Sequence, residues 1–188
     1  ARIMFFSKLK STLKNGFLKD EKGAVAIEAM IMIPAILLVL ASIFTLYDAF
    51  RQNTMHQKAA YTIGDMVSRE TMSIDNDYID GAQGVFKTLT RSSQESSVRI
   101  SILYYDKATK TFKLDWSKSR GDHQALTDSD VTNWSDRLPV LVDQERIIVV
   151  ETYADYVPPF NTGLGTREIS NFIFTRPRYA PQVTWTDS

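Results

Sequence analysis

The apolar positions of the chain are most concentrated between Gly23 and Tyr47, where Glu28 is the one acidic or basic side chain. At about 1.5 Å per residue, a helix over this stretch matches or slightly exceeds a bilayer hydrocarbon core of about 30 Å. A core helix of a soluble protein does not need to be apolar on every face. The pattern therefore predicts a single transmembrane helix over residues 23–47.

Charge differs on the two sides of this stretch. Six basic and two acidic residues precede it, whereas Asp48 and Arg51 balance each other just after it. Because positive residues stay on the cytoplasmic side, we expect residues 1–22 in the cytoplasm and the rest of the chain outside a bacterial inner membrane, in the periplasm. A cleavable secretory signal peptide is the alternative, but its apolar region has about 7–15 residues.

Two segments flanking the apolar stretch also have helical periodicity. Residues 1–22 have apolar side chains at steps of three and four with lysines between them, which predicts a basic amphipathic helix on the membrane surface. A disordered basic tail is the alternative. Residues 48–72 continue the helical spacing and predict a stalk that packs on the outer domain, locally weakened by Gly64.

Residues 73–188 are expected to form the periplasmic domain. An apolar stripe from Tyr78 to Leu89 predicts a helix capped by Asn76 or Asp77. A short helix is expected over 128–137, ended by Pro139. Alternating apolar positions predict strands at residues 98–104 and 112–116, which form a hairpin with one face in the core, and two further strands are expected at residues 146–155 and 169–175 as a second hairpin.

These elements define the expected fold class. Helices grouped ahead of and between strands indicate an α+β domain with an antiparallel sheet of about four strands and one or two helices. The residues between the last two strands, which include Pro158, Pro159, Gly163 and Gly165, predict a hairpin loop. The tail from Arg176 is expected to be extended.

Composition narrows the function classes. The chain has 22 basic and 22 acidic residues and no cysteine. The neutral balance gives no sign of a nucleic-acid-binding surface. Without cysteine there are no disulfides, thiolate metal sites or cysteine nucleophiles. We therefore expect no nucleic acid partner.

Residues that bear catalytic or metal-binding side chains lack a recognisable arrangement. His56 is expected on a solvated face of the stalk, and His123 in a polar loop without further ligands. The acidic cluster from Asp75 to Asp80 lacks the glycine and glutamate positions of a calcium loop, so a helix cap fits it better. We predict a non-enzymatic protein with no catalytic residue, no metal and no cofactor.

Glu28 is the residue of the apolar stretch that is least favourable inside a membrane. A carboxylate at the centre of a membrane helix costs about 2.5–3.5 kcal/mol, and less toward the interface. One interpretation is a carboxyl group near the headgroups, protonated or reaching back to Lys22. The other is a residue that pairs with a second membrane helix.

The segment KDEKGAVAIEAMIMIP, residues 19–34, resembles the start of TadE/TadG-like proteins, the minor pilins or pseudopilins of the bacterial tight-adherence system. Gly23, Glu28 and Pro34 match that pattern in type and order. Residues 158–160 and 175–181 also resemble the closing part of such chains. The resemblance implies peptidase cleavage between Gly23 and Ala24, a helix kink at Pro34 and a role for Glu28 in subunit assembly within the pilus.

The residues before Gly23 suggest an alternative function. A chain that keeps them would be an uncleaved accessory or structural subunit, bound through its membrane helix to a larger bioenergetic or transport complex of the inner membrane. Both hypotheses expect the membrane and other membrane or pilus proteins as partners. Small residues such as Ala26, Ala29 and Ala35 permit close helix contact in either case.

Overall fold

The computed structural model describes residues 21–91 and 95–187, and within the first helix it describes side chains from Val25 onward. The chain forms two compact units, Ala1–Leu46 and Tyr47–Ser188. A long apolar helix precedes a small domain with a four-stranded antiparallel sheet and two helices, so the predicted α+β class is confirmed. The structure does not describe residues 1–20, so most of the surface helix predicted for residues 1–22 lies outside the described residues.

Helix α2 runs from Glu21 to Ser68 and continues through Pro34. It includes the predicted transmembrane segment and most of the predicted stalk, but it ends four residues before residue 72. The carbonyl oxygen of Ser68 accepts a hydrogen bond from the backbone N–H of Arg178 at 2.8 Å. The C-terminal tail therefore satisfies a carbonyl that a further helical turn would have satisfied.

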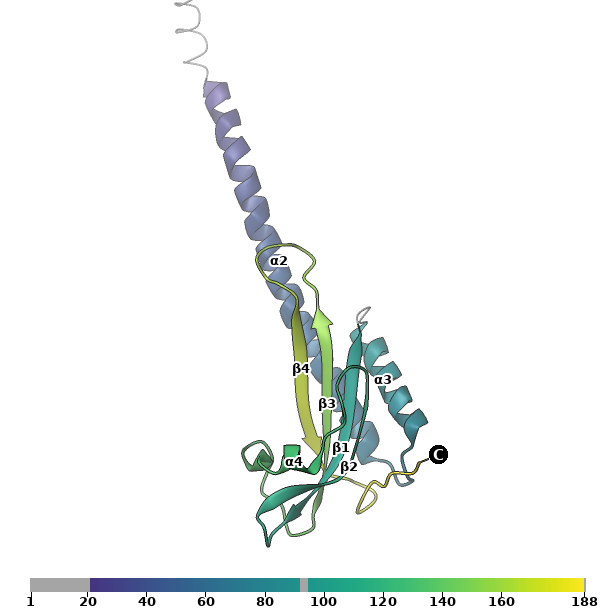
Figure 1. Ribbon diagram of the computed structural model, residues 1–188. Coiled ribbons are helices and arrows are strands. Elements are labelled where there is room, and N and C mark those ends of the chain that lie inside the picture. Colours follow the sequence, from purple (N-terminus) through teal and green to yellow (C-terminus); the bar gives the residue numbers. More distant parts are fainter. Residues whose placement is uncertain (1–20, 92–94, 188) are drawn as a thin grey trace, which may run out of the picture. The chain divides into compact units, whose positions relative to one another are not determined.

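The sheet consists of two hairpins joined through their inner strands (Figure 1). Its strands are β1 (Ser96–Asp106), β2 (Thr111–Arg120), β3 (Arg146–Tyr156) and β4 (Arg167–Thr175), in the order β2-β1-β3-β4. Every neighbouring pair is antiparallel. Residues 157–166 connect β3 to β4, which confirms the predicted hairpin loop. Strands β2 and β4 form the two edges.

The main core lies between one face of the sheet and two helices, the second half of α2 and α3 (Asn76–Thr90). Helix α3 starts at Asn76, and its cap is Asp75 rather than the predicted Asn76 or Asp77, because Asp75 Oδ1 accepts a hydrogen bond from the Tyr78 N–H at 2.9 Å. This contact confirms the capping role of the acidic cluster. Buried apolar side chains from both helices and the strands fill the core: Ile63, Val67, Ile79, Phe86, Val98, Ile100, Ile102, Ile148 and Val150.

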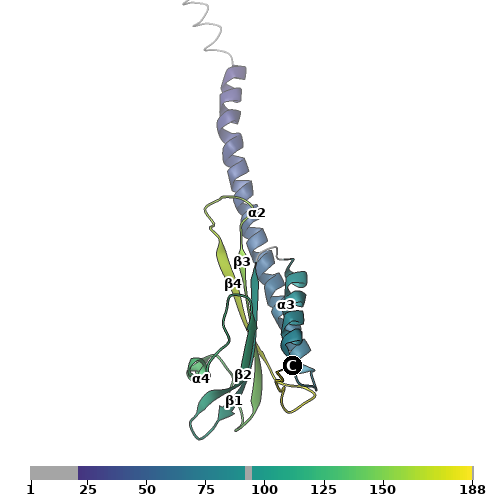
Figure 2. The same ribbon diagram turned by 45° about the vertical axis from the view of Figure 1, so that its right-hand side comes forward.

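The opposite face of the sheet carries a second, smaller core. Figure 2 shows α3 and the short helix α4 (Asp128–Val131) on opposite sides of the sheet. The predicted helix over 128–137 is divided into α4 and a 3-10 turn at Trp134–Asp136. Val131 and Trp134 pack there with Leu103, Phe112, Leu138, Leu141, Ile147 and Val149. Both faces of the first hairpin therefore carry buried side chains, whereas the prediction placed one face in the core.

A β-bulge changes the side-chain pattern of β2. Ile102 pairs with Trp116 and Leu103 pairs with Leu114, so Asp115 has no partner residue on β1. The extra residue shifts the alternation by one position. Trp116 consequently packs against the main core, whereas Leu114 and Phe112 join the second core. Strict alternation had placed all three residues on one face.

The C-terminal tail is extended, as expected, but it is part of the main core. Val183 is 1% exposed, and its carbonyl oxygen accepts a hydrogen bond from the Trp116 indole N–H at 2.9 Å. Trp185 forms a parallel bridge with Ile74, where backbone hydrogen bonds of 2.8 and 3.0 Å hold the two segments together. The tail thus closes the core near the start of α3.

Candidate membrane anchor and surfaces of the domain

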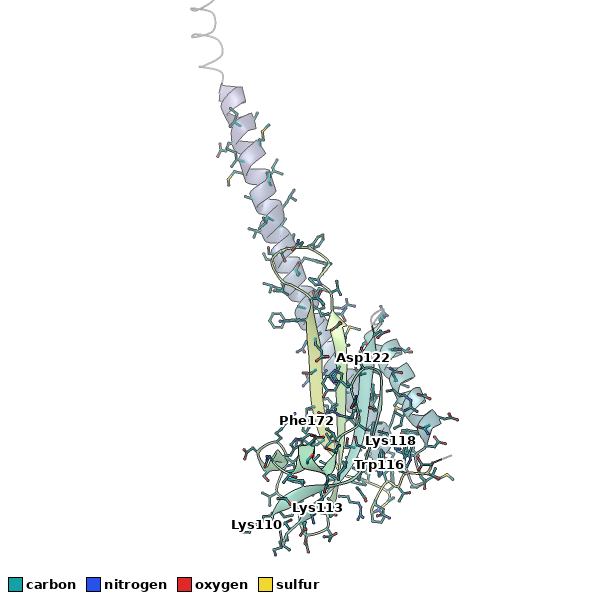
Figure 3. The ribbon with its side chains drawn as sticks, viewed as in Figure 1. Lys110, Lys113, Trp116, Lys118, Asp122 and Phe172 are labelled. Atoms are coloured by element: carbon teal, nitrogen blue, oxygen red, sulfur yellow. The ribbon has the colours of Figure 1, made fainter. Side chains whose placement is uncertain are left out.

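The first unit contains a helix whose large apolar side chains face outward. From Val25 to Leu46 these side chains are 48–75% exposed, and they project from every side of the helix (Figure 3). Its most apolar window has a mean hydropathy of 2.6. Monomeric soluble proteins rarely expose apolar patches larger than a few hundred Å². The helix is long and apolar enough to cross a membrane.

Four of the residues singled out in the sequence lie in the first part of α2. Gly23 and Ala24 are already helical, two and three residues after the helix begins. Glu28 is exposed among the apolar side chains and makes no ion pair with the side chains described from Val25 onward. Pro34 lies inside the helix. The structure thus places the four residues on one helical segment of about 17 Å, at a rise of about 1.5 Å per residue.

The domain begins with a contact between α2 and the β3–β4 loop. The Tyr156 hydroxyl donates a hydrogen bond to Asp48 Oδ2 at 3.2 Å. Ala49, Tyr156 and Ile169 form a small buried cluster with Leu164 of the loop packed against it. Burial, followed by the hydrogen bond to Asp48, raises the pKa of the Tyr156 hydroxyl. Both ends of the loop are therefore attached to the first turn of the domain.

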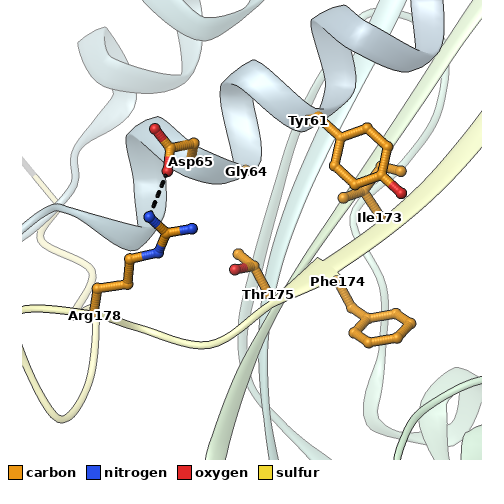
Figure 4. A pocket seen from close by; sticks show the side chains of 7 residues that line it. All are labelled: Tyr61, Gly64, Asp65, Ile173, Phe174, Thr175 and Arg178. Atoms are coloured by element: carbon orange, nitrogen blue, oxygen red, sulfur yellow. Dashed lines mark ion pairs between the residues drawn. The ribbon is translucent and has the colours of Figure 1, made fainter.

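A cavity of 330 Å³ lies between α2 and the edge strand β4 (Figure 4). Tyr61 and Gly64 line it from the helix, and β4 contributes Ile173, Phe174 and Thr175. At one end Asp65 forms ion pairs with Arg178 at 3.1 Å and Arg69 at 2.8 Å. Because Asp65 and Arg178 pair with each other, the lining residues offer no unpaired charge to a ligand.

A polar cluster lies on the second face of the sheet. Arg99 Nε donates to Glu151 Oε2 at 2.7 Å, and Arg99 also donates to the Tyr153 hydroxyl at 2.9 Å. Burial is the main reason why the pKa of Tyr153 is raised to about 12. The His123 ring stacks on Tyr153 at 3.6 Å and contacts Glu168 at 2.9 Å. The sequence signals for this cluster were single charged residues inside apolar strands: Arg99 lies between Val98 and Ile100, and Glu151 follows four apolar residues of β3.

His56 is not on a solvated face, contrary to the prediction. Its side chain is 3% exposed and meets the Phe86 ring edge-on, with 5.4 Å between ring centroids. Its Nδ1 has no hydrogen-bond partner within residues 21–91 and 95–187. Burial therefore lowers the pKa of this histidine. Helical spacing did not reveal its burial, because α3 covers this face of α2.

The described residues contain no group of three or more histidine, aspartate or glutamate side chains suited to hold a metal ion. What the fold defines is an α+β domain that follows an apolar helix. Comparison with protein-family models, curated proteins and solved structures gave no match to the chain. The resemblance to TadE-like proteins therefore stays a prediction that rests on the sequence.

Proposed function

We propose that this chain is a non-enzymatic, single-span membrane protein whose α+β domain binds protein partners outside the membrane. One observation carries the proposal: the apolar segment from Val25 to Leu46 exposes its large side chains all round the helix. Such a surface is stable in lipid and unfavourable in water. The same helix continues to Ser68 as an element of the domain core.

The sequence order supports a pilin-like role in assembly. A basic segment precedes Gly23, Glu28 follows five residues later, and the apolar helix leads directly into the domain. On this proposal the protein lies in a bacterial inner membrane, with its N-terminus in the cytoplasm and its domain in the periplasm. Its function there is assembly of a tight-adherence pilus through contacts between subunits.

Glu28 provides a direct test of helix pairing. A carboxylate inside a membrane helix is costly unless it has a partner, so its loss should weaken association with another membrane protein. In mild detergent, we expect Glu28→Ala to reduce recovery of co-purifying partners while membrane insertion is retained. Ile27→Ala is the matched control, because this neighbouring side chain is also exposed and is uncharged. Equal recovery from the two variants would contradict a pairing role.

The second candidate is an uncleaved accessory subunit of another membrane complex. The observation that favours it is the helical backbone at Gly23 and Ala24, since proteolytic cleavage prefers exposed loops. Sequencing the N-terminus of the native protein and identifying its co-purifying proteins separates the candidates. The pilin proposal expects a new N-terminus at Ala24 together with pilus proteins. An intact leader in an unrelated complex would contradict it and support the second candidate.

A further inference from the structure

The loop between β3 and β4 differs from the other surface segments in its composition. Its ten residues, Val-Pro-Pro-Phe-Asn-Thr-Gly-Leu-Gly-Thr at positions 157–166, contain no acidic or basic side chain. Val157 is 52% exposed and Phe160 is 48% exposed. A loop that meets water alone does not need this combination. Its chemistry suits a boundary between an apolar and a polar medium.

The position of the loop gives it such a boundary. Tyr156 and Leu164 attach it to Asp48 and Ala49, through the hydrogen bond and the buried cluster described above. Asp48 follows the end of the apolar segment, at Leu46, by two residues, which is about 3 Å of helix. The loop is therefore attached to the turn of α2 that, if the proposed function is right, lies where the helix leaves the bilayer.

Aromatic side chains on the same turns of α2 agree with an interfacial location. Tyr47 is 65% exposed and Phe50 is 71% exposed. Tyrosine and tryptophan are enriched where membrane helices meet the headgroups, because their rings combine an apolar body with a polar group, and Phe50 adds an exposed apolar ring beside Tyr47. Arg51 and Lys58 follow them along the helix, so basic groups lie next to the aromatic ones.

The opposite end of the sheet has a different character. The β1–β2 turn is next to the start of β3, since Tyr104 pairs with Arg146, whereas Ser96 pairs with Ala154 near the loop. The turn contains the exposed charged residues Lys107 and Lys110, the second of which is labelled in Figure 3. An eleven-residue strand such as β3 separates the two ends by about 36 Å. The turn is therefore a matched control position for the loop.

We propose that the β3–β4 loop inserts into the headgroup region of the same bilayer that the apolar part of α2 spans. This inference rests on the proposed function, because it needs the apolar helix to be in the membrane. Irregular backbone is not tolerated in the hydrocarbon core, where its polar groups would lack partners. Insertion therefore stops at the interface, where the side chains of Val157 and Phe160 meet lipid and the amide of Asn161 meets headgroups.

The absence of cysteine allows a site-specific test with the full chain. An environment-sensitive fluorophore is attached to Asn161→Cys in the loop, Ala108→Cys in the β1–β2 turn, or Leu37→Cys in the apolar helix. Each protein is reconstituted into vesicles of phosphatidylethanolamine and phosphatidylglycerol that contain lipids with a quencher either near the headgroup or deep in the acyl chain. We expect severalfold stronger quenching at position 161 than at 108, and most by the shallow quencher. Position 37 should respond most to the deep quencher.

The outcomes distinguish this inference from the proposed function. If position 37 is quenched and position 161 behaves like 108, the loop does not touch lipid and the inference is wrong, although the anchor stands. If position 37 is not quenched either, both proposals fail. Emission at 161 that shows exclusion of water without quenching by lipid would mean that protein covers the loop, which also overturns the inference.

A second variant tests the contribution of the apolar side chains. In the Asn161→Cys protein, Phe160→Asp should reduce quenching at position 161 severalfold, because a carboxylate disfavours the interface. Phe174→Asp is the matched control, since Phe174 is similarly exposed, at 45%, and lies near the other end of β4. Equal quenching with and without Phe160→Asp would contradict insertion driven by this ring.

Discussion

Gly64 tests how closely α2 packs on the sheet. It is buried, and a Cβ atom added there would lie 3.7 Å from Ile173 Cγ2, 3.9 Å from Thr175 Cγ2 and 4.0 Å from Val150 Cγ2. These are ordinary van der Waals distances. One methyl group therefore fits at position 64, but the further carbons of a larger side chain meet the strands.

Two substitutions at this position should have opposite effects. Gly64→Ala should stabilise the domain by about 1 kcal/mol, because alanine is a better helix former and its methyl group fits. Gly64→Leu gains a similar helix propensity but overfills the contact with the strands. Gly64 also lines the cavity of 330 Å³, but the three atoms nearest to its added Cβ belong to the strands, and overpacking of such a contact costs about 1–3 kcal/mol.

Gly81 in α3 is the matched control, since a Cβ atom there meets no atom within 4 Å. Gly81→Leu gains helix propensity without a steric cost, so Gly64→Leu should be less stable than Gly81→Leu by about 1–3 kcal/mol. Unfolding by urea in mild detergent measures this difference. Tryptophan fluorescence reports on the domain specifically, because Trp116, Trp134 and Trp185 all lie in it. Equal stability of the two leucine variants would refute close packing of α2 at Gly64.

Three further predictions concern the core and its polar groups. The pKa of His56 is lowered on folding, so the unfolded chain binds the proton more tightly and the domain loses stability as the pH falls below about 6.5. Urea unfolding at pH 7.5 and at pH 5 should show a smaller loss of stability for His56→Phe than for the unchanged protein. Equal losses for the two proteins would contradict a buried, neutral His56. Val183→Ala should cost about 2 kcal/mol in urea unfolding, from two buried methyl groups and a cavity, whereas Val140→Ala, at a side chain that is 92% exposed, should change stability by less than about 0.5 kcal/mol. Glu151→Ala leaves the mostly buried Arg99 without its carboxylate and should cost about 3 kcal/mol; a double-mutant cycle with Arg99→Ala should recover part of this loss, and strict additivity would show that the pair is not coupled.

Features that depend on nearby residues could be predicted from the sequence. The apolar stretch, the helical stripe of α3 and the alternation in the strands have periods that belong to one element, so each predicts its own structure. The cap of α3 is also a local feature, because its hydrogen bond joins residues three apart, but the pattern indicated Asn76 or Asp77 and the structure has Asp75. The hairpin loop after β3 was signalled by its prolines and glycines.

Features set by tertiary contacts could not be predicted from the sequence. The bulge at Asp115 depends on how β2 pairs with β1, and without it Trp116 is assigned to the wrong face. His56 has a polar side chain at a helical position, and its burial depends on the neighbouring helix α3. The early end of α2 depends on the tail, which supplies the Arg178 N–H from 110 positions further along the chain.

The attachment of the β3–β4 loop to the start of the domain is a further feature of this kind. Asp48 and Tyr156 are 108 positions apart, and no local pattern connects them. The apolar composition of the loop was present in the sequence, but its significance depends on where the fold places it. The surface with the most specific proposed role therefore needed the structure.

Membrane topology tests the central claim most directly. Single-cysteine variants of the full chain at Ser7, before the apolar segment, and at Ala108, in the domain, are treated with a membrane-impermeant thiol reagent in intact bacterial spheroplasts and after the membrane is permeabilised. We predict that Ala108→Cys reacts in intact spheroplasts and that Ser7→Cys reacts only after permeabilisation. Reaction of both positions from the same side of the intact membrane would contradict a helix that spans it.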